Sequence, residues 1–384
     1  MYDRNIKLDF DSKDSYFLFG PRGTGKTTWL KQHCQDSFYI DLLQSSYFTE
    51  LSAQPDRLEK IIPKNNIDYI IVDEVQRIPE LLNEVHRLIE NNQYRFILTG
   101  SSARSLRKRG VNLLAGRALT YYMYPLTVSE LGKDFDLQRS LNYGHLPKAV
   151  ISSSPKKFLK SYINTYLREE VLQEGLVRQL RVFTRFLEVA SFSQGALLNM
   201  TEIGRELGVD RKTVESYFSI LDDLLLGSRL NCFSRRAKRN IVKHSKFYYF
   251  DVGVYRAIRP RGPLDDESEM GGVACETLVY QELIACNQYC NYEYSIYFWK
   301  TLQGYEVDFV LYGPKKLLAI EVKQSTRVNI NDLKGLRAFA SEYPEAKAYL
   351  FYGGDNVYYE DNITILPLTN ALSELPTILG QINQ

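Results

Sequence analysis

The sequence predicts an α/β protein in which a parallel sheet with helices on both faces is followed by a helical region and a second α/β domain. Three observations lead to this fold class. Short β-rich runs alternate with helical stretches from about residue 15 to 125, as in βαβ units. From about 127 to 228 the apolar spacing is helical, and from about 272 a helix is followed by further β-rich runs.

Composition is that of an ordinary globular protein. The chain has 384 residues, 44% hydrophobic and 24% charged, which is unlike disordered, collagen-like or coiled-coil sequences. Its 48 basic residues nearly cancel its 46 acidic ones, so the net charge of +2 does not indicate a partner. At roughly 100–200 residues per domain, the length predicts about two to four domains.

Hydropathy and cysteine usage predict a cytoplasmic protein with no membrane partner. The apolar runs, such as residues 69–72, are far shorter than the roughly 18–20 residues needed to cross a bilayer. The first ten residues alternate charged and apolar side chains, unlike the apolar core of a signal peptide. The five cysteines form no C-x-x-C pair, and we expect free thiols in a reducing compartment.

The amino-terminal sheet is predicted to contain five strands. Each candidate is a short run that is mostly apolar or aromatic. They lie at 16–19, 38–42, 69–72, 95–98 and 119–123. Because helical stretches separate these runs, the strands are expected to be parallel and covered on both faces.

The segment directly after the first strand has the pattern G-x-x-x-x-G-K-[ST] and opens a helical stretch. Its glycines let backbone N–H groups turn toward phosphate oxygens, and the helix N-terminus adds a favourable dipole. Lys26 is expected to reach the β- and γ-phosphates of ATP, and the Thr27 hydroxyl to ligate Mg²⁺. The expected nucleotide-binding residues of this loop are Gly20, Pro21, Arg22, Gly23, Thr24, Gly25, Lys26, Thr27 and Thr28.

Two carboxylates, Asp73 and Glu74, directly follow the apolar run at 69–72. An Asp at the end of a buried strand can hold the Mg²⁺ shell, and the following Glu can polarise the attacking water. Alone, such a pair is more often an ordinary charge pair at a helix N-terminus. Together with the loop, it predicts that Asp73 contacts the metal and nucleotide and that Glu74 is catalytic.

The strand near residue 96 and the loop after it supply further candidates. The strand ends in hydroxyls, and Ser101 is expected to sense the γ-phosphate; the alternative is an ordinary polar strand end. An arginine is often needed to stabilise the transferring phosphoryl charge. The candidates are Arg104, Arg107, Arg109 and Arg117, of which Arg117 is favoured as catalytic.

Residues 200–217 contain two short apolar-periodic stretches around a glycine turn. The second stretch is expected to present Arg211, Lys212 and Ser216 outward. Downstream, residues 235–246 hold six basic and no acidic side chains. These features predict a winged helix that contacts DNA phosphates; the alternative is a packing module beside an ATPase domain.

The carboxy-terminal third has the element order helix–strand–strand–strand–helix–strand, which matches the core of restriction-type nucleases. A linker or mobile loop at 259–267 precedes it. The predicted helices are 273–286 and 331–343, and the predicted strands are 296–299, 307–312, 317–322 and 346–351.

Carboxylates and a lysine are expected to meet within this order. Strand alternation puts Glu321 and Lys323 on one face, and a hairpin would place Asp308 beside them. Asp308 and Glu321 would then hold Mg²⁺ or Mn²⁺, with Glu276 as a further carboxylate ligand, while Lys323 orients water or stabilises developing charge. The set predicts a metal-dependent nuclease-like site; the alternative is a nuclease fold used only for binding or packing.

Taken together, the chain resembles the predicted bacterial and archaeal ATPases in which an AAA-type P-loop domain precedes a winged helix and a PD-(D/E)xK-type domain. The resemblance extends over nearly the whole chain. It implies ATP binding and hydrolysis, with domains at 1–126, 127–258 and 259–384. Leu146 stands where an aromatic residue is usual. The resemblance is carried by residues 20–27, 69–74 with Gln76, 98–102, 114–117, 124–126 with Glu130, 144–147, Glu276 with Glu282, 306–308 and 321–323.

The leading hypothesis is a Mg²⁺-dependent ATPase whose nucleotide state controls a DNA-directed nuclease-like domain. Glu74 would position the water, while Lys26, Mg²⁺ and an arginine stabilise the developing charge. The alternatives are a nucleotide-dependent switch, and a DNA- or protein-binding module with an inactive nuclease fold. An arginine shared between copies would favour a homo-oligomer, and a self-contained site would allow a monomer.

Overall fold

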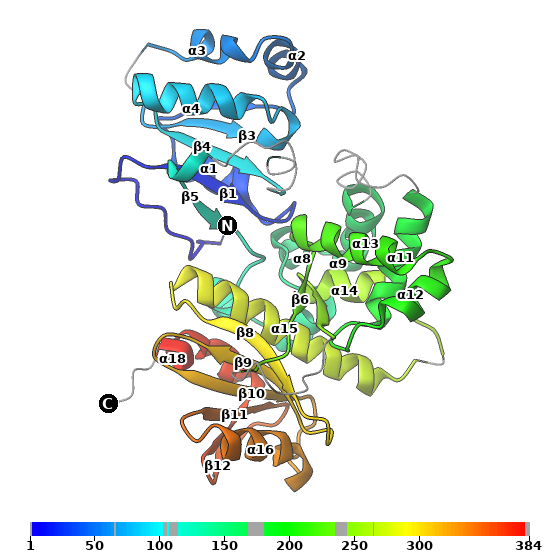
Figure 1. The fold of residues 1–384 in the computed structure, drawn as a ribbon. Helices are drawn as coiled ribbons and strands as arrows, with labels where there is room; N and C mark the ends of the chain where they lie inside the picture. Colours follow the sequence, from blue (N-terminus) through cyan, green and yellow to red (C-terminus); the bar gives the residue numbers. More distant parts are fainter. Residues whose placement is uncertain are drawn as a thin grey trace. The chain divides into compact units, whose positions relative to one another are not determined.

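The computed structural model contains two compact units (Figure 1). The structure describes residues 2–380, apart from 65–66, 103–105, 107–113, 168–179, 235–243 and 264. The predicted domain boundary at residue 126 lies next to the junction between the two units. The two units do not divide at residue 258, so the predicted boundary at that residue stays a prediction. The P-loop unit comprises Arg4–Tyr124 and Asp223–Leu226, and the carboxy-terminal unit comprises Met1–Asp3, Pro125–Asp222 and Gly227–Gln384.

The P-loop unit is built on a five-stranded sheet with the strand order β2-β3-β4-β1-β5. All neighbouring strands run parallel, so the predicted parallel sheet is confirmed. Each strand begins and ends within two residues of its predicted range. The strands are β1 (Ser15–Phe19), β2 (Phe38–Asp41), β3 (Ile70–Asp73), β4 (Phe96–Gly100) and β5 (Ala118–Tyr122).

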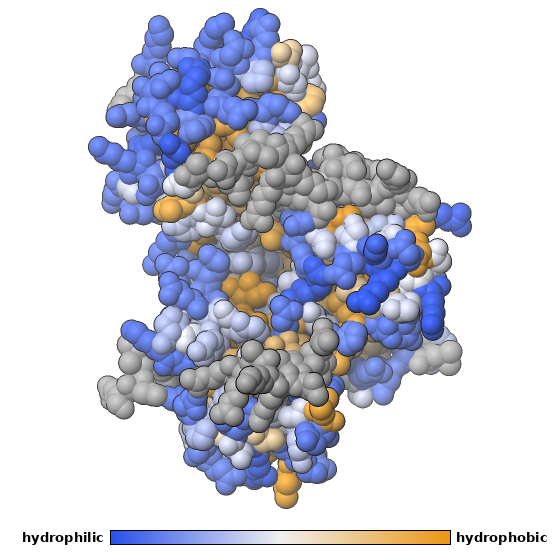
Figure 2. Space-filling model, viewed as in Figure 1, coloured by the Kyte–Doolittle hydropathy of each residue, from blue (hydrophilic) through white to orange (hydrophobic). Residues whose placement is uncertain are grey.

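Helices bury the apolar side chains of this sheet. Phe17 and Phe19, two residues apart and therefore on one face, belong to the same apolar cluster as Leu88 of α4. The surface of the unit is largely hydrophilic on the face that Figure 2 shows. Its helices and 3₁₀ turns are α1 (Lys26–His33), α2 (Ser45–Ala53), η1 (Pro55–Arg57), α3 (Leu58–Ile61), η2 (Val75–Arg77), α4 (Leu81–Asn92) and η3 (Leu114–Gly116).

The carboxy-terminal unit begins with a helical region that ends in a small antiparallel sheet. Gly208 adopts φ +67° between α12 and α13, and Arg211, Lys212 and Ser216 of α13 are exposed as predicted. The elements are α6 (Val128–Leu131), η4 (Gly132–Asp134), α7 (Leu137–Tyr143), α8 (Pro147–Ile151), α9 (Pro155–Ser161), the π-helical η5 (Tyr162–Leu167), α11 (Leu180–Phe192), α12 (Met200–Leu207), α13 (Arg211–Asp223), β6 (Gly227–Leu230), β7 (Lys246–Tyr249) and α14 (Val252–Ile258).

A six-stranded sheet with the order β12-β13-β11-β10-β9-β8 forms the rest of this unit. On one face, Phe339 of α16 joins the apolar cluster of the sheet; on the other, Tyr280 of α15 stacks on Phe309 with 5.7 Å between ring centroids. No described helix is long and apolar enough to span a bilayer. The elements are α15 (Glu267–Tyr289), β8 (Ser295–Lys300), β9 (Glu306–Tyr312), β10 (Leu317–Lys323), η6 (Ile330–Leu333), α16 (Lys334–Glu342), β11 (Lys347–Tyr352), β12 (Tyr358–Glu360), β13 (Ile363–Pro367), α17 (Leu368–Ser373) and α18 (Leu375–Gly380).

Candidate functional site

The glycine-rich loop joins β1 to α1 in a shape that only glycine allows at several positions. Gly23 and Gly25 have φ of +83° and +100°, which side chains rarely adopt. A Cβ on Gly20 would overlap the carbonyl oxygen of Met123. The Lys26 ammonium lies inside the loop and donates to the carbonyl of Gly20 at 2.6 Å. The loop therefore surrounds a cation at the start of α1.

Asp73 lies at the end of β3 and faces the start of α1. The Thr27 hydroxyl donates to Asp73 Oδ2 at 2.7 Å, and the hydroxyls of Tyr39 and Thr99 donate to the same carboxylate. Burial and the Asp73 charge raise the pKa of Tyr39, so this phenol stays a donor. Thr27 and Asp73 together offer the oxygen ligands that suit Mg²⁺. Tyr39 and Thr99 were not anticipated, because only the strand order brings them here.

Glu74 and Ser101 are joined by a glutamine. Gln76 Nε2 donates to Glu74 Oε2 at 2.5 Å and to Ser101 Oγ at 3.2 Å. A Cβ on Gly100 would overlap the Gln76 amide, so a larger residue there would displace this amide. Glu74 itself has φ +61°, a strained conformation of the kind that clusters at functional sites. Since β4 lies between β1 and β3, Ser101 emerges between the loop and the two carboxylates.

The predicted catalytic role of Arg117 is not supported within a single copy of the chain. Arg117 precedes β5, and β5 runs parallel to β1, so Arg117 lies at the edge of the sheet opposite to the loop. There it forms an ion pair with Glu90. The other three candidates, Arg104, Arg107 and Arg109, lie outside the described residues.

Arg4 is the arginine that the structure brings to the glycine-rich loop. Its guanidinium donates to the carbonyls of Thr24, at 2.5 Å, and Tyr124, at 2.6 Å. It thereby ties the loop to the residue that ends the P-loop unit. No sequence signal marked Arg4, because a single arginine 20 residues from the contacted carbonyl has no recognisable spacing.

A segment distant in sequence also belongs to the P-loop unit. The Ser102 hydroxyl donates to the carbonyl of Asp223 at 2.8 Å, and Leu225 packs against the apolar cluster of the sheet. This segment, Asp223–Leu226, directly connects α13 to β6. The hydroxyl next to Ser101 is therefore bonded to the chain that leaves α13.

The predicted carboxylates of the carboxy-terminal sheet do meet. The Val322 amide donates to Asp308 Oδ2 at 2.9 Å, and the Asp308 amide to Glu321 Oε2 at 3.3 Å. Lys323 Nζ lies 2.6 Å from Glu321 Oε1. Burial, and then the neighbouring charge of Asp308, raise the pKa values of both Glu276 and Glu321. The four residues thus form one buried charge cluster.

A second lysine, Lys246 of β7, supplies positive charge to this cluster. Its side chain is 4% exposed, and its Nζ lies 2.6 Å from Glu306 Oε1 and 3.6 Å from Asp308 Oδ1. Burial opposes its protonation, but the charges of Asp308, Glu276 and Glu306 outweigh this and raise the pKa of Lys246. The sequence predicted Lys246 only as the last residue of a basic wing. The other basic Lys and Arg residues of that wing lie at 235–243, outside the described residues.

The expected metal site at Glu276, Asp308 and Glu321 stays a prediction. Within the described part of the chain, no group of three or more His, Cys, Asp or Glu side chains is placed to hold a metal ion. The contacts present are those of Lys246 with Asp308, Lys323 with Glu321, and the Tyr248 hydroxyl with Glu276. The raised pKa values of Glu276 and Glu321 indicate that these contacts only partly compensate the negative charge of the cluster.

Three sequence families match successive stretches of the chain. Residues 12–132 match a family described as an AAA domain. Residues 134–265 and 271–371 match two families that are each described as a domain of unknown function. The AAA match coincides with the sheet and loop of the P-loop unit.

Relatives along most of the chain include two described as uncharacterized proteins. One, from Haemophilus influenzae, is 21% identical over 365 residues, which span 86% of this chain and 88% of that protein. The other, from Methanocaldococcus jannaschii, is 23% identical over 348 residues, which span 82% and 76%.

Solved structures give weaker likenesses. The Aeropyrum pernix ORC1 protein in complex with DNA is 13% identical, with a TM-score of 0.31, and the match covers 64% of this chain and 86% of that one. A protein of Vibrio cholerae is 12% identical, with a TM-score of 0.22 and coverage of 95% and 97%. TM-scores this low do not establish a common fold.

Proposed function

We propose that the protein is a Mg²⁺-dependent ATPase, because residues 12–132 match a family described as an AAA domain and carry the glycine-rich loop. The observation that carries the proposal is the meeting of the glycine-rich loop, Asp73 and Glu74 at the same edge of a parallel sheet. Thr27 and Asp73 would hold the metal. Bound Mg²⁺ would neutralise charge on the β- and γ-phosphates.

The proposed chemistry divides among this chain's own residues. Glu74 positions the attacking water, and Lys26 stabilises charge that develops on the γ-phosphate. The bridge through Gln76 supports a role for Ser101 in detecting that phosphate. From the opposite edge of the sheet, Arg117 would take part only from a second copy of the chain, so a site completed by this arginine would require a homo-oligomer.

Replacing Lys26 by alanine tests the ATPase proposal. We expect ATP turnover to fall by at least about 10²–10³-fold, because a preorganised charge at the γ-phosphate is lost. Phosphate release measured in wild type, K26A and the exposed-surface control K60A would show the loss in K26A alone. Near-normal hydrolysis by K26A would contradict the assignment.

The nucleotide state is proposed to act on the region that follows Asp223. Ser102 holds this segment beside the proposed sensor, and β6, which comes next, pairs with β7 so that Leu230 lies opposite Lys246. The proposal is that ATP binding moves Ser101 and Ser102, and with them the segment that connects α13 to β6. This route supports control of a DNA-directed region, or a switch in which turnover is incidental.

A second candidate function concerns the buried charge cluster. Lys246 favours a nuclease-derived fold that binds DNA or protein without cleaving, because metal-dependent cleavage would first require this ammonium to leave Asp308. The metal-dependent nuclease remains the rival proposal, with Asp308, Glu321 and Lys323 as its catalytic groups.

Incubation with plasmid DNA separates these two proposals. In Mg²⁺ or Mn²⁺, with and without ATP, we expect no strand cleavage but DNA retention that weakens steeply as salt rises. The double variant E321A/K323A serves as the control. Cleavage by wild type that disappears in this control would instead establish the nuclease, and its dependence on ATP would establish the coupling.

A further inference from the structure

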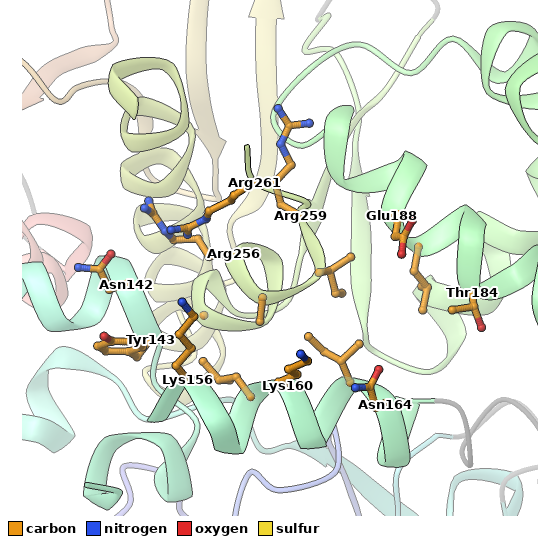
Figure 3. A pocket seen from close by; sticks show the side chains of 16 residues that line it. Asn142, Tyr143, Lys156, Lys160, Asn164, Thr184, Glu188, Arg256, Arg259 and Arg261 are labelled. Carbon is orange, nitrogen blue, oxygen red and sulfur yellow. The ribbon is translucent and has the colours of Figure 1, made fainter. Parts of the chain in front are cut away.

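A cavity of about 420 Å³ lies within the carboxy-terminal unit (Figure 3), and no residue of the charge cluster described above lines it. Its walls come from the end of α7, from α9 and η5, from α11, and from α14 with the residues that follow it. This volume falls in the range of about 300–1,000 Å³ that small-molecule sites occupy. The cavity is therefore large enough for a ligand of nucleotide size.

The lining of this cavity is strongly cationic. Lys156 and Lys160 rise from α9 toward α14, which carries Arg256, while Arg259 and Arg261 follow that helix (Figure 3). Among the lining residues the sole carboxylate is Glu188, which forms an ion pair with Arg185 at 3.2 Å. The lining thus carries a clear excess of positive charge, which would attract an anion with more than one negative charge.

Arg259 has hydrogen-bonding capacity that the described residues leave unused. Its guanidinium stacks 3.7 Å from the ring centroid of Phe192, and its Nη2 lies 3.4 Å from Asp265. Its Nε and Nη1 are buried and have no hydrogen-bond partner within the described residues. Arg259 thus adds positive charge to the lining with part of its donor capacity unused, and its guanidinium extends away from Lys156 and Lys160 (Figure 3). The ion pair between Arg259 and Asp265 lies within the predicted loop at 259–267, and Arg259 and Arg261 of this loop line the cavity.

Apolar side chains complete the lining. Leu159, Leu187 and Ile258 are buried around the cationic groups, and Tyr143 lies at the end of α7. Sites for small organic ligands combine such apolar walls with a few polar groups that fix orientation.

We propose that this cavity binds a small organic phosphate of mononucleotide size. A phosphate monoester carries about −1.5 to −2 charges at neutral pH, which is opposite in sign to the excess charge of the lining. The forked N–H donors of arginine suit its oxygens, and the apolar walls suit a flat organic body. This site is independent of the glycine-rich loop.

A matched set of lysines on α9 tests the proposal. Lys156, Lys157 and Lys160 are all exposed, but only Lys156 and Lys160 line the cavity. AMP binding is measured by calorimetry in the full-length K26A chain, which lacks the ammonium of the glycine-rich loop, and the lysine variants of α9 are compared within this chain. We expect K156E/K160E to weaken it by at least about 100-fold, through the loss of two charge-assisted contacts, and K157E to change it less than about 3-fold.

Three results would overturn the proposal. One is the absence of AMP binding by the K26A chain at millimolar concentrations. Another is equal weakening by K157E and K156E/K160E, which would indicate general charge attraction. The third is binding of a single-stranded oligonucleotide in place of AMP, which would make the cavity part of a nucleic-acid surface. Circular dichroism and thermal unfolding of each variant establish that the chains compared are folded.

Discussion

Replacing Glu74 by glutamine is expected to stop ATP hydrolysis while ATP binding persists. The amide keeps the size of the side chain and its contact with Gln76, but it cannot accept a proton from the attacking water. Loss of a general base lowers turnover by about 10²–10⁴-fold. Single-turnover hydrolysis and binding of a fluorescent ATP analogue would measure the two properties separately.

The control for this experiment is Glu80→Gln, an exposed carboxylate of the same unit. It should hydrolyse ATP at the wild-type rate. If E74Q also turned over ATP at that rate, another group would have to position the water. If E74Q lost binding as well as turnover, its effect would be structural, which is possible because Glu74 occupies a strained backbone position.

Replacing Lys246 by alanine is expected to lower the free energy of unfolding by about 3–5 kcal/mol, since breaking a buried ion pair leaves uncompensated charge. Lys300 is the matched control. It contacts the same Glu306 at 2.6 Å, but its side chain is 29% exposed, against 4% for Lys246. Loss of a more exposed pair costs about 0–1 kcal/mol. Denaturant titrations of K246A and K300A measure both effects.

Divalent cations give the Lys246 prediction a second measurement. If the ammonium takes the place of a metal, K246A should regain part of its stability in Mn²⁺, whereas wild type should not change. Removing a carboxylate as well, in K246A/D308N, should abolish this recovery. Equal stability of K246A and K300A would show that the cluster does not depend on Lys246.

Local sequence was sufficient to predict the five strands of the amino-terminal sheet and the glycine-rich loop. The loop is eight contiguous residues, and its glycines and the following helix follow from backbone conformations that neighbouring residues set. The five amino-terminal strands were likewise predictable, because short buried runs between helical stretches form parallel sheets. The strands β6, β7, β12 and β13 escaped prediction, and β12 and β13 lie beyond the recognised element order.

Long-range packing was needed for the contacts that join these elements. Sheet order brings Thr99 to Asp73 and Ser101 to Gln76, and it separates Arg117 from the loop by the length of β5. These outcomes depend on which strands are neighbours, a property that the spacing of residues along the chain does not contain.

The sequence alone was enough to identify the phosphate-binding loop, the two carboxylates of the proposed ATPase and the acidic strands of the carboxy-terminal sheet. In each case the chemistry belongs to residues that are contiguous or share one strand. The fold was needed to find Lys246 among those acids, Arg4 at the loop and the cationic cavity around Arg259. Each of these three features combines residues from elements that are distant in sequence. Their positions therefore depend on the free energy of tertiary packing and not on local propensity.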